Sequence, residues 1–234
     1  NNRIAYKTRF KAIKTKDKNL ALAAANFARN VQNNPASSIA RKAYDYQMLE
    51  YYKGISDTMN FLRSAVSYCE NYYMNISKDS ILKVDSLYKQ KQLGSFVTDT
   101  LQKQKVIAKS LTDTGSKENK TVRTVFKQTV RMMQAPFANE ISSTLCNYAK
   151  DIYRLSNNQL YIQKALAYAE RAASVAENPE SYNVYAILLY KNNLAQEAID
   201  WEEKAIKIAK IRNYGVARYE SLVKQMKLEE NVDF

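Results

Sequence analysis

Few side chains in this sequence could carry chemistry, and the commonest catalytic group is missing. Histidine does not occur among the 234 residues. Because histidine is the usual acid–base group near neutral pH and the commonest metal ligand, its absence excludes histidine-based zinc sites, Ser-His-Asp triads and Cys-His nucleophile pairs. We therefore expect no catalytic residue, no metal site and no cofactor site in this chain, and we expect that it is not an enzyme.

The two cysteines do not form a recognisable redox motif. Cys69 and Cys146 each lie within an apolar pattern at helical spacing, and no C-x-x-C sequence occurs. Free cysteine is among the most buried residue types and packs as a small hydrophobic side chain. We predict that both cysteines are unpaired and buried in helices.

Positive charge is concentrated in two segments. The net charge is +13, and residues 1–18 carry seven Lys or Arg against one Asp, while residues 83–131 carry eleven against four acidic residues. Such segments can bind nucleic acid, an anionic surface or an acidic protein, or they can be solvated helix faces. We favour solvated faces, because Lys dominates and no RNP, KH, helix-turn-helix or zinc-finger signature is present. Binding to nucleic acid or an anionic surface stays as an alternative.

The elements that must position any functional side chain are expected to be helices. Only four Gly and three Pro occur, too few for the turns of an all-β fold. Apolar residues at helical spacing predict consecutive helices that pair as antiparallel hairpins. These helices are expected over residues 3–16, 18–33, 35–52, 57–74, 160–176, 195–210 and 212–228, with two more from 137 to the turn at 157–158 and from 179 to the turn at 192–193.

Turn signals mark the ends of these helices and one domain boundary. Asn34-Pro35 and Asn178-Pro179 each predict a helix start, with Asn as the N-cap and Pro at the first helical position. Gly54 is expected to end a helix through a positive φ. Residues 112–121 have the composition of a loop. We expect this loop to separate N-terminal hairpins over residues 1–111 from C-terminal hairpins, with a capping helix, over residues 122–234.

Two helical segments near the C-terminus show the same pattern of small and apolar residues, at a spacing of 33 residues. Ala165, Leu166, Ala169, Ala172 and Ala173 return as Ala198, Ile199, Glu202, Ala205 and Ile206. Such a spacing indicates a helical-hairpin repeat, whose units stack to bury a shared core and leave an open surface.

Residues 177–210 are similar to a tetratricopeptide repeat. Tyr182 stands at the first aromatic position of that family, Ala186 at the small position of the first helix, and Ala198 and Ala205 at the two alanines of the second helix. The segment that precedes these residues also fits the repeat pattern, with a longer loop between its two helices. The sequence departs from the family pattern at Tyr185, where Leu is typical, at Glu202, where a bulky apolar residue is usual, and near residue 210, where the terminal Pro is missing.

The resemblance implies which side chains line a concave groove that binds a protein or peptide. Matching the repeat position by position assigns to this groove Lys150, Tyr153, Arg154, Asn183, Tyr190 and Lys191. Tyrosine followed by a base suits such a surface, because the ring supplies rigid contact area and the cation meets carboxylates. The alternative is that these rings pack between helices.

A second resemblance concerns cellular context. Residues 165–206 resemble the helical tail that follows a thioredoxin-like domain in some exported bacterial proteins. This implies a periplasmic or envelope-associated protein, with the cytoplasm as the alternative. Triplets such as Asp57-Thr58-Met59 and Asp85-Ser86-Leu87 resemble O-glycosylation acceptors of envelope proteins, and they fit helix caps equally well. No run of 18 apolar residues occurs, so no transmembrane segment is expected.

These observations predict an all-α fold, a right-handed stack of antiparallel helical hairpins like a tetratricopeptide α-solenoid. The expected function is a non-catalytic scaffold that binds a protein or peptide, within a larger envelope-associated bacterial protein. Two alternatives remain open. One is a binder of nucleic acid or an anionic surface through residues 1–18 and 83–131, and the other is the accessory helical region of a thioredoxin-like thiol-disulfide oxidoreductase.

Overall fold

The computed structural model describes residues 2–91 and 135–234, and every regular element in these ranges is helical. The chain is also helical over residues 78–91. The named elements are α1 (Asn2–Thr15), α2 (Lys18–Asn30), α3 (Ser38–Gly54), α4 (Thr58–Cys69), the π-helical turn η1 (Glu70–Met74), α7 (Pro136–Leu155), α8 (Gln159–Val175), α9 (Pro179–Lys191), α10 (Ala195–Ile211) and α11 (Ala217–Lys227).

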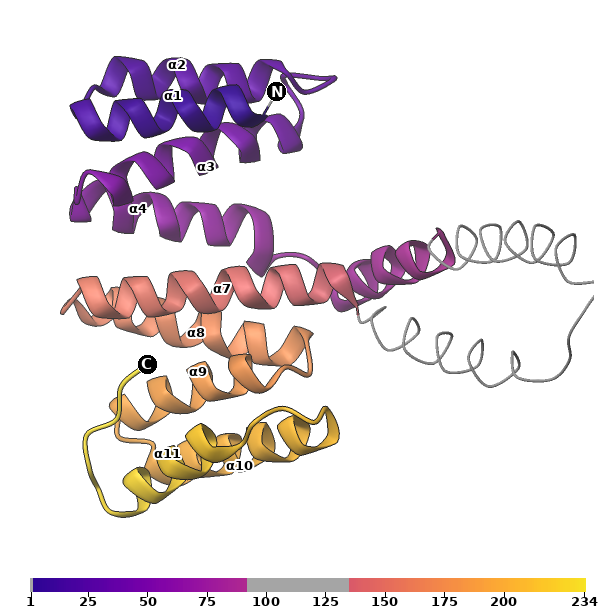
Figure 1. Ribbon diagram of the computed structural model, residues 1–234, viewed down its shortest axis with the longest axis vertical. Helices are drawn as coiled ribbons and strands as arrows, with labels where there is room; N and C mark the ends of the chain where they lie inside the picture. Colours follow the sequence, from indigo (N-terminus) through magenta and orange to yellow (C-terminus); the bar gives the residue numbers. More distant parts are fainter. Residues whose placement is uncertain (1, 92–134) are drawn as a thin grey trace, which may run out of the picture.

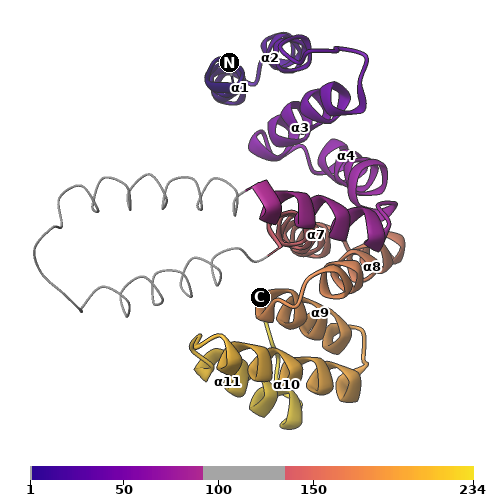
Figure 2. The same cartoon turned by 90° about the vertical axis from the view of Figure 1, so that its right-hand side faces the viewer.

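The helices pack in consecutive antiparallel pairs that stack along the long axis of the molecule (Figure 1). The pairs are α1 with α2, α3 with α4, α7 with α8, and α9 with α10, and α11 packs on α10. In Figure 2, α1, α3 and α7 lie on one side of the stack, whereas α2, α4 and α8 lie on the other. The predicted all-α stack of helical hairpins is therefore confirmed.

One core runs through most of the stack. It begins at Leu49 of α3, passes through α4, α7, α8 and α9, and reaches Val232 beyond α11. Alanines at helical spacing on α8, including Ala165, Ala169 and Ala172, are fully buried, and their small side chains allow α7 and α9 to approach closely. The predicted boundary at residues 112–121 lies outside the described residues. The core itself is continuous from α4 to α7.

A smaller core attaches α1 and α2 to α3. It is made of Ala12, Ala21, Ala25, Met48 and Tyr51. Three of its five members are alanines, and partly buried side chains such as Ile13 and Leu20 pack against them.

The two Asn-Pro sequences behave differently. Asn178 does cap α9, and its Oδ1 accepts a hydrogen bond from the Glu180 backbone N–H at 3.1 Å. The prediction at Asn34-Pro35 is wrong, because α3 begins at Ser38. Ser37 is the N-cap there and accepts from the Ala40 N–H at 3.1 Å. Ser is as good a cap as Asn, so packing decides between the two positions.

Gly54 ends α3 as predicted, but for a different reason. Its φ is not positive, and the left-handed residue is Ser56, with φ of 60°. A Cβ atom at Gly54 would lie 2.6 Å from Ile13 Cδ1 of α1. The absence of a side chain at residue 54 is therefore what lets α1 approach the end of α3.

Asp85 ties residues 78–91 to α7. Its buried carboxylate accepts hydrogen bonds from the backbone N–H groups of Phe137, at 2.8 Å, and Ala138, at 3.2 Å. These are two of the donors that a helix leaves unsatisfied at its N-terminus. Asp57 caps α4 through the Asn60 N–H at 3.2 Å. Asp57 thus caps the helix that its own triplet begins, whereas Asp85 lies within the helix of residues 78–91 and caps α7 instead.

Cys69 and Cys146 are free and buried, as predicted. Burial raises the pKa of the Cys69 thiol and raises the pKa of Cys146 to about 12. Reactive cysteines have lowered pKa values, so both thiols have the character of packing residues. Among the helices described, none has both the length and the apolar composition needed to cross a bilayer.

Candidate functional site

A groove of about 620 Å³ runs between α3 and α7. Each helix supplies one polar stripe whose members recur every three or four residues, the spacing that puts them on one helix face. The α3 stripe consists of Lys42, Tyr46, Glu50 and Lys53, and the α7 stripe consists of Glu140, Thr144, Asn147, Asp151 and Arg154, with Lys150 beside it.

Three further tyrosines line the groove between these stripes. Tyr68 of α4 contacts Tyr73 of η1 at 5.7 Å and Tyr148 of α7 at 5.8 Å between ring centroids, both edge to face. Burial raises the pKa of Tyr68 and of Tyr148. The hydroxyl groups therefore stay protonated. Tyr68, Tyr73 and Tyr148 are buried and form the floor of the groove, whereas Tyr46 of the α3 stripe is 39% exposed.

Two ion pairs connect the walls of the groove. Lys42 Nζ lies 4.0 Å from Glu140 Oε1, and Lys53 pairs with Asp151. Lys42 Nζ also lies 4.4 Å from the centre of the Tyr73 ring, a cation–π contact. Both lysines keep solvent-exposed surface, so their charges stay available to a ligand.

A second hollow of about 280 Å³ continues the groove toward the end of α7. Lys53, Asp151 and Arg154 line both hollows, and Phe61 and Leu155 make the second one more apolar. The combined surface can accept apolar groups at one end and groups of either charge along its length.

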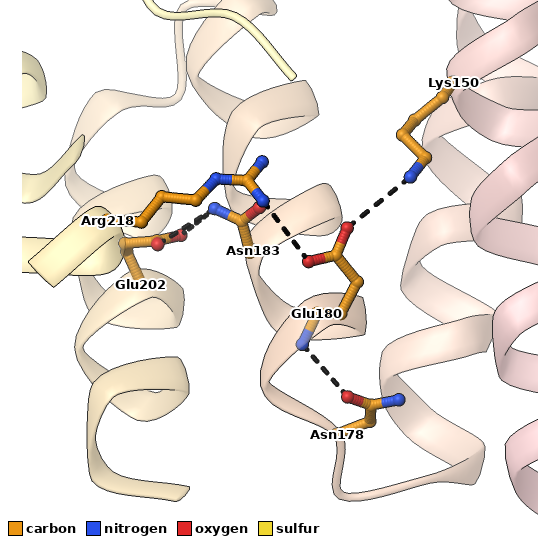
Figure 3. Close-up of polar contacts among 6 residues, drawn as sticks. All are labelled: Lys150, Asn178, Glu180, Asn183, Glu202 and Arg218. Carbon is orange, nitrogen blue, oxygen red and sulfur yellow. Dashed lines mark hydrogen bonds and ion pairs between the residues drawn. The ribbon is translucent and has the colours of Figure 1, made fainter. Parts of the chain in front are cut away.

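Lys150 and Arg154, two of the predicted groove residues, line this groove. Lys150 Nζ also lies 3.5 Å from Glu180 Oε1, while Glu180 Oε2 lies 3.7 Å from Arg218 Nη1. Figure 3 shows Glu180 between these two cations, with its backbone N–H held by Asn178. Lys150 therefore links α7 to α9 as well as facing the groove.

Four predicted residues form an adjoining surface that we call the α7/α9 ledge: Tyr153 and Arg154 of α7, and Tyr190 and Lys191 of α9, with Arg154 shared with the groove. The ledge is covered by the chain's own residues 230–234. The repeat spacing assigned these four side chains to one groove, and in the structure they lie together under the C-terminal segment. It did not indicate that the C-terminal segment contacts them.

Asn183 differs from the prediction, because it is fully buried between α9 and α10 and does not reach the groove. Its Nδ2 donates to both carboxylate oxygens of Glu202, at 2.9 and 3.1 Å (Figure 3). Glu202 occupies the repeat position where an apolar residue is usual, and Asn183 supplies the partner that a buried carboxylate needs. Burial raises the pKa of Glu202 to about 7. The Asn183 Oδ1 atom is buried without a hydrogen-bond partner.

Sequence reasoning missed the α3 wall of the groove. Tyr46 fits the apolar helical pattern of residues 35–52, yet it is 39% exposed and lines the groove. The recurrence of polar side chains at Lys42, Tyr46, Glu50 and Lys53 was the available signal. Tyr46 is aromatic and therefore fits an apolar helical pattern equally well, so the polar stripe was not recognised from the sequence.

The first basic segment keeps most of its positive charge at the surface, because Arg3, Lys7, Lys11, Lys14, Lys16 and Lys18 are all exposed. Residues 92–131 of the second segment lie outside the described part of the chain. In the first segment, Arg9 is buried, donates to Gln47 Oε1 at 3.0 Å and lies 5.3 Å from the centre of the Tyr46 ring. Within residues 2–91 and 135–234, no three acidic or cysteine side chains are grouped to hold a metal ion.

Comparison with known proteins gives one weak structural similarity. No protein-family model matches the chain, and no curated protein gives a significant match. A similar solved structure is described as "Assembly Chaperone of RpL4 (Acl4) (Residues 1-338)", with 14% identity, coverage of 88% of this chain and 75% of that chain, and a TM-score of 0.30. Functional inference therefore depends on the geometry of the chain itself.

Proposed function

We propose that this chain is a non-catalytic scaffold that binds an extended segment of another protein in the groove between α3 and α7. The observation that carries the proposal is the tyrosine-lined hollow between two lysine–carboxylate pairs. The lack of histidine and the buried, protonated thiols support a binding role over a catalytic one.

The groove chemistry defines the kind of segment that would bind. The exposed Tyr46 ring gives rigid contact area for aliphatic or aromatic side chains, and its hydroxyl group can bond to a peptide backbone. The Lys42–Glu140 and Lys53–Asp151 pairs are partly exposed, and such pairs contribute little to folding. A ligand that carries both positive and negative groups can therefore replace one partner of each ion pair at little cost in folding free energy. We therefore expect a mixed-charge segment with apolar residues between the charges.

Capture of protein partners from native extract, compared between matched variants, tests this proposal. The unmodified chain, the groove variant Tyr46→Ala and the control Tyr214→Ala are immobilised, and bound proteins are quantified by mass spectrometry. Tyr214 is exposed on the loop after α10, away from the groove. We expect at least one protein to be retained by the unmodified chain and by Tyr214→Ala, and lost from Tyr46→Ala.

Two further measurements make the test decisive. Circular dichroism must show that Tyr46→Ala keeps its helical content, so that loss of binding reflects the groove. Equal capture by all three chains, or capture of no protein by any of them, would contradict the proposal. Binding to DNA, RNA or acidic vesicles that weakens steeply with salt would instead favour the basic segments as the functional surface.

The envelope location and the association with a thioredoxin-like domain remain predictions from sequence resemblance. We propose them as the context in which the scaffold acts. Detection of the native protein in periplasmic and cytoplasmic fractions distinguishes the envelope location from the cytoplasmic alternative.

A further inference from the structure

The final residues of the chain lie along the α7/α9 ledge instead of extending α11. α11 ends at Lys227, and Glu229 has a left-handed backbone, with φ of 56°. Residues 230–234 then run without regular structure back toward α9 and α7 (Figure 1). Val232 is only 1% exposed, so this segment is packed against the molecule.

The ledge contacts three different chemical groups of this segment. The Tyr190 hydroxyl donates to the Glu230 backbone carbonyl at 3.0 Å, and Lys191 Nζ lies 2.9 Å from Asp233 Oδ1. The Phe234 ring lies 6.0 Å from the Tyr153 ring, edge to face, and 5.2 Å from Arg154 Cζ. A backbone carbonyl, a carboxylate and an aromatic ring are therefore each held by a separate side chain. Extended peptide ligands are recognised through the same set of groups.

The polar part of this contact is exposed enough to exchange. The Asp233 side chain is 79% exposed, whereas the Lys191 side chain that binds it is 16% exposed. An ion pair with one solvated partner contributes little to folding. With residues 230–234 in place the cation is largely covered, whereas the anion is solvated and could be supplied by another chain.

We infer that residues 229–234 are an intramolecular ligand of the α7/α9 ledge, and that a partner segment with an acidic residue directly before an aromatic one displaces them. This inference builds on the proposed function, because Arg154 belongs to both the ledge and the groove. Displacement would extend the groove onto α9. The occupied ledge limits binding to partners that carry the acidic–aromatic pair.

A labelled peptide with the sequence of residues 228–234, LEENVDF, amidated at its C-terminus, tests the inference by fluorescence anisotropy. Its binding is compared between the unmodified full chain and the full chain carrying Asp233→Lys and Phe234→Ala. The unmodified tail competes at an effective concentration of about 1 mM, so we expect the substituted chain to bind the peptide at least about tenfold more tightly. The single substitution Asp233→Asn should give a smaller gain in the same direction.

Charge reversal on the ledge provides the matched control. Added to the substituted chain, Lys191→Glu should weaken peptide binding by at least about tenfold, because it replaces an attraction by a repulsion. Lys210→Glu reverses a lysine that pairs with Glu220 at 3.2 Å away from the ledge, and it should leave binding unchanged. Equal binding by the unmodified and substituted chains would overturn the inference. So would binding insensitive to Lys191→Glu, or no binding by the Asp233→Asn chain.

Failure of this test is separable from failure of the proposed function. The peptide assay uses no external partner and measures binding to the ledge alone. Capture that depends on Tyr46 measures binding to the groove between α3 and α7. Absence of peptide binding together with Tyr46-dependent capture overturns the ledge inference alone.

Discussion

The two walls of the groove are supported by different kinds of packing. Behind α7, the main core contains fully buried large side chains such as Leu145, Ile152 and Leu188. α3 contributes Leu49 to the main core, and it also packs on the smaller core, which consists of alanines with Met48 and Tyr51. Cation–aromatic contacts add to this wall, as where Arg9 lies against Tyr46.

This difference predicts different mobility for the two walls. Apolar burial stabilises in proportion to area, so α7 should stay fixed while α1, α2 and the start of α3 open locally at lower free energy. A groove with one rigid and one adaptable wall can close on segments of different width. The ledge lies entirely on the rigid side, where the C-terminal segment already fills it.

The largest expected effect on stability distinguishes the main core from the smaller core. Leu145→Ala should lower the free energy of unfolding by about 4 kcal/mol, because a fully buried leucine leaves a cavity in the main core. Met48→Ala should cost about 2 kcal/mol, because the small core around it can collapse more easily. Chemical denaturation measures both values. Hydrogen exchange should show that Met48→Ala exposes amides of α1–α3 and spares α7, and protection lost equally in α7 would refute the comparison.

Glu202 should make the C-terminal side of the stack sensitive to pH. Its carboxyl has a pKa of about 7 in the folded chain and an ordinary value of 4.5. Between these values the folded state holds a proton that the unfolded state has lost, so the free energy of unfolding falls as pH rises from about 4.5 to about 7. The loss is about 3 kcal/mol.

Substitution of this carboxyl isolates its contribution. Glu202→Gln should remove most of the fall in stability over that pH range, measured by denaturant unfolding at a series of pH values. Glu203→Gln is the matched control, because Glu203 is exposed and pairs with Lys227 at 3.3 Å. An unchanged pH profile in Glu202→Gln would mean that the buried carboxyl does not titrate in this range.

A moderate effect on stability is expected from a substitution at the contact between α1 and α3. Gly54→Ala adds a Cβ atom 2.6 Å from Ile13 Cδ1, which must shift. The crowding costs about 1–3 kcal/mol, and alanine recovers up to about 1 kcal/mol of helix propensity. We expect a net loss of about 1 kcal/mol, seen as earlier loss of protection in α1. Gly215→Ala meets no atom within 4 Å and should change stability by less than about 0.5 kcal/mol.

The smallest effect on folding is expected at the ion pairs between the walls. Lys53→Ala should change the free energy of unfolding by less than about 1 kcal/mol, because the pair with Asp151 is partly exposed. Partner capture, by contrast, should weaken. A loss of several kcal/mol in thermal unfolding would show that the pair fixes the walls, and that α3 is not adaptable.

Part of the site could be predicted from the sequence, because repeat spacing reflects local structure. The pattern around Ala165 and Ala198 gave the hairpins α7–α10, and it placed Lys150 and Arg154 on the side that forms the groove. Asn183, which the repeat spacing also assigned to the groove, lies buried against α10 in the structure. A buried Glu202 draws the amide inward to satisfy its carboxylate.

The α3 wall was missed because its signal is not local. Lys53 finds its partner Asp151 from 98 residues away, and nothing in the sequence near either residue indicates the pairing. Asn34 shows the same limit at a smaller scale, since two capping residues compete within four positions and only packing selects Ser37.

The sequence by itself determined the class of fold and the spacing of the helices, because helical periodicity depends only on which residues occur and in what order. The lack of histidine, which excludes histidine-based catalytic sites, is likewise a property of the sequence alone. The tertiary structure alone decided which faces meet. It brought α3 opposite α7 to make a groove, and it laid Asp233 on Lys191 to cover the ledge. Both arrangements depend on packing between distant segments, which burial of the shared core selects.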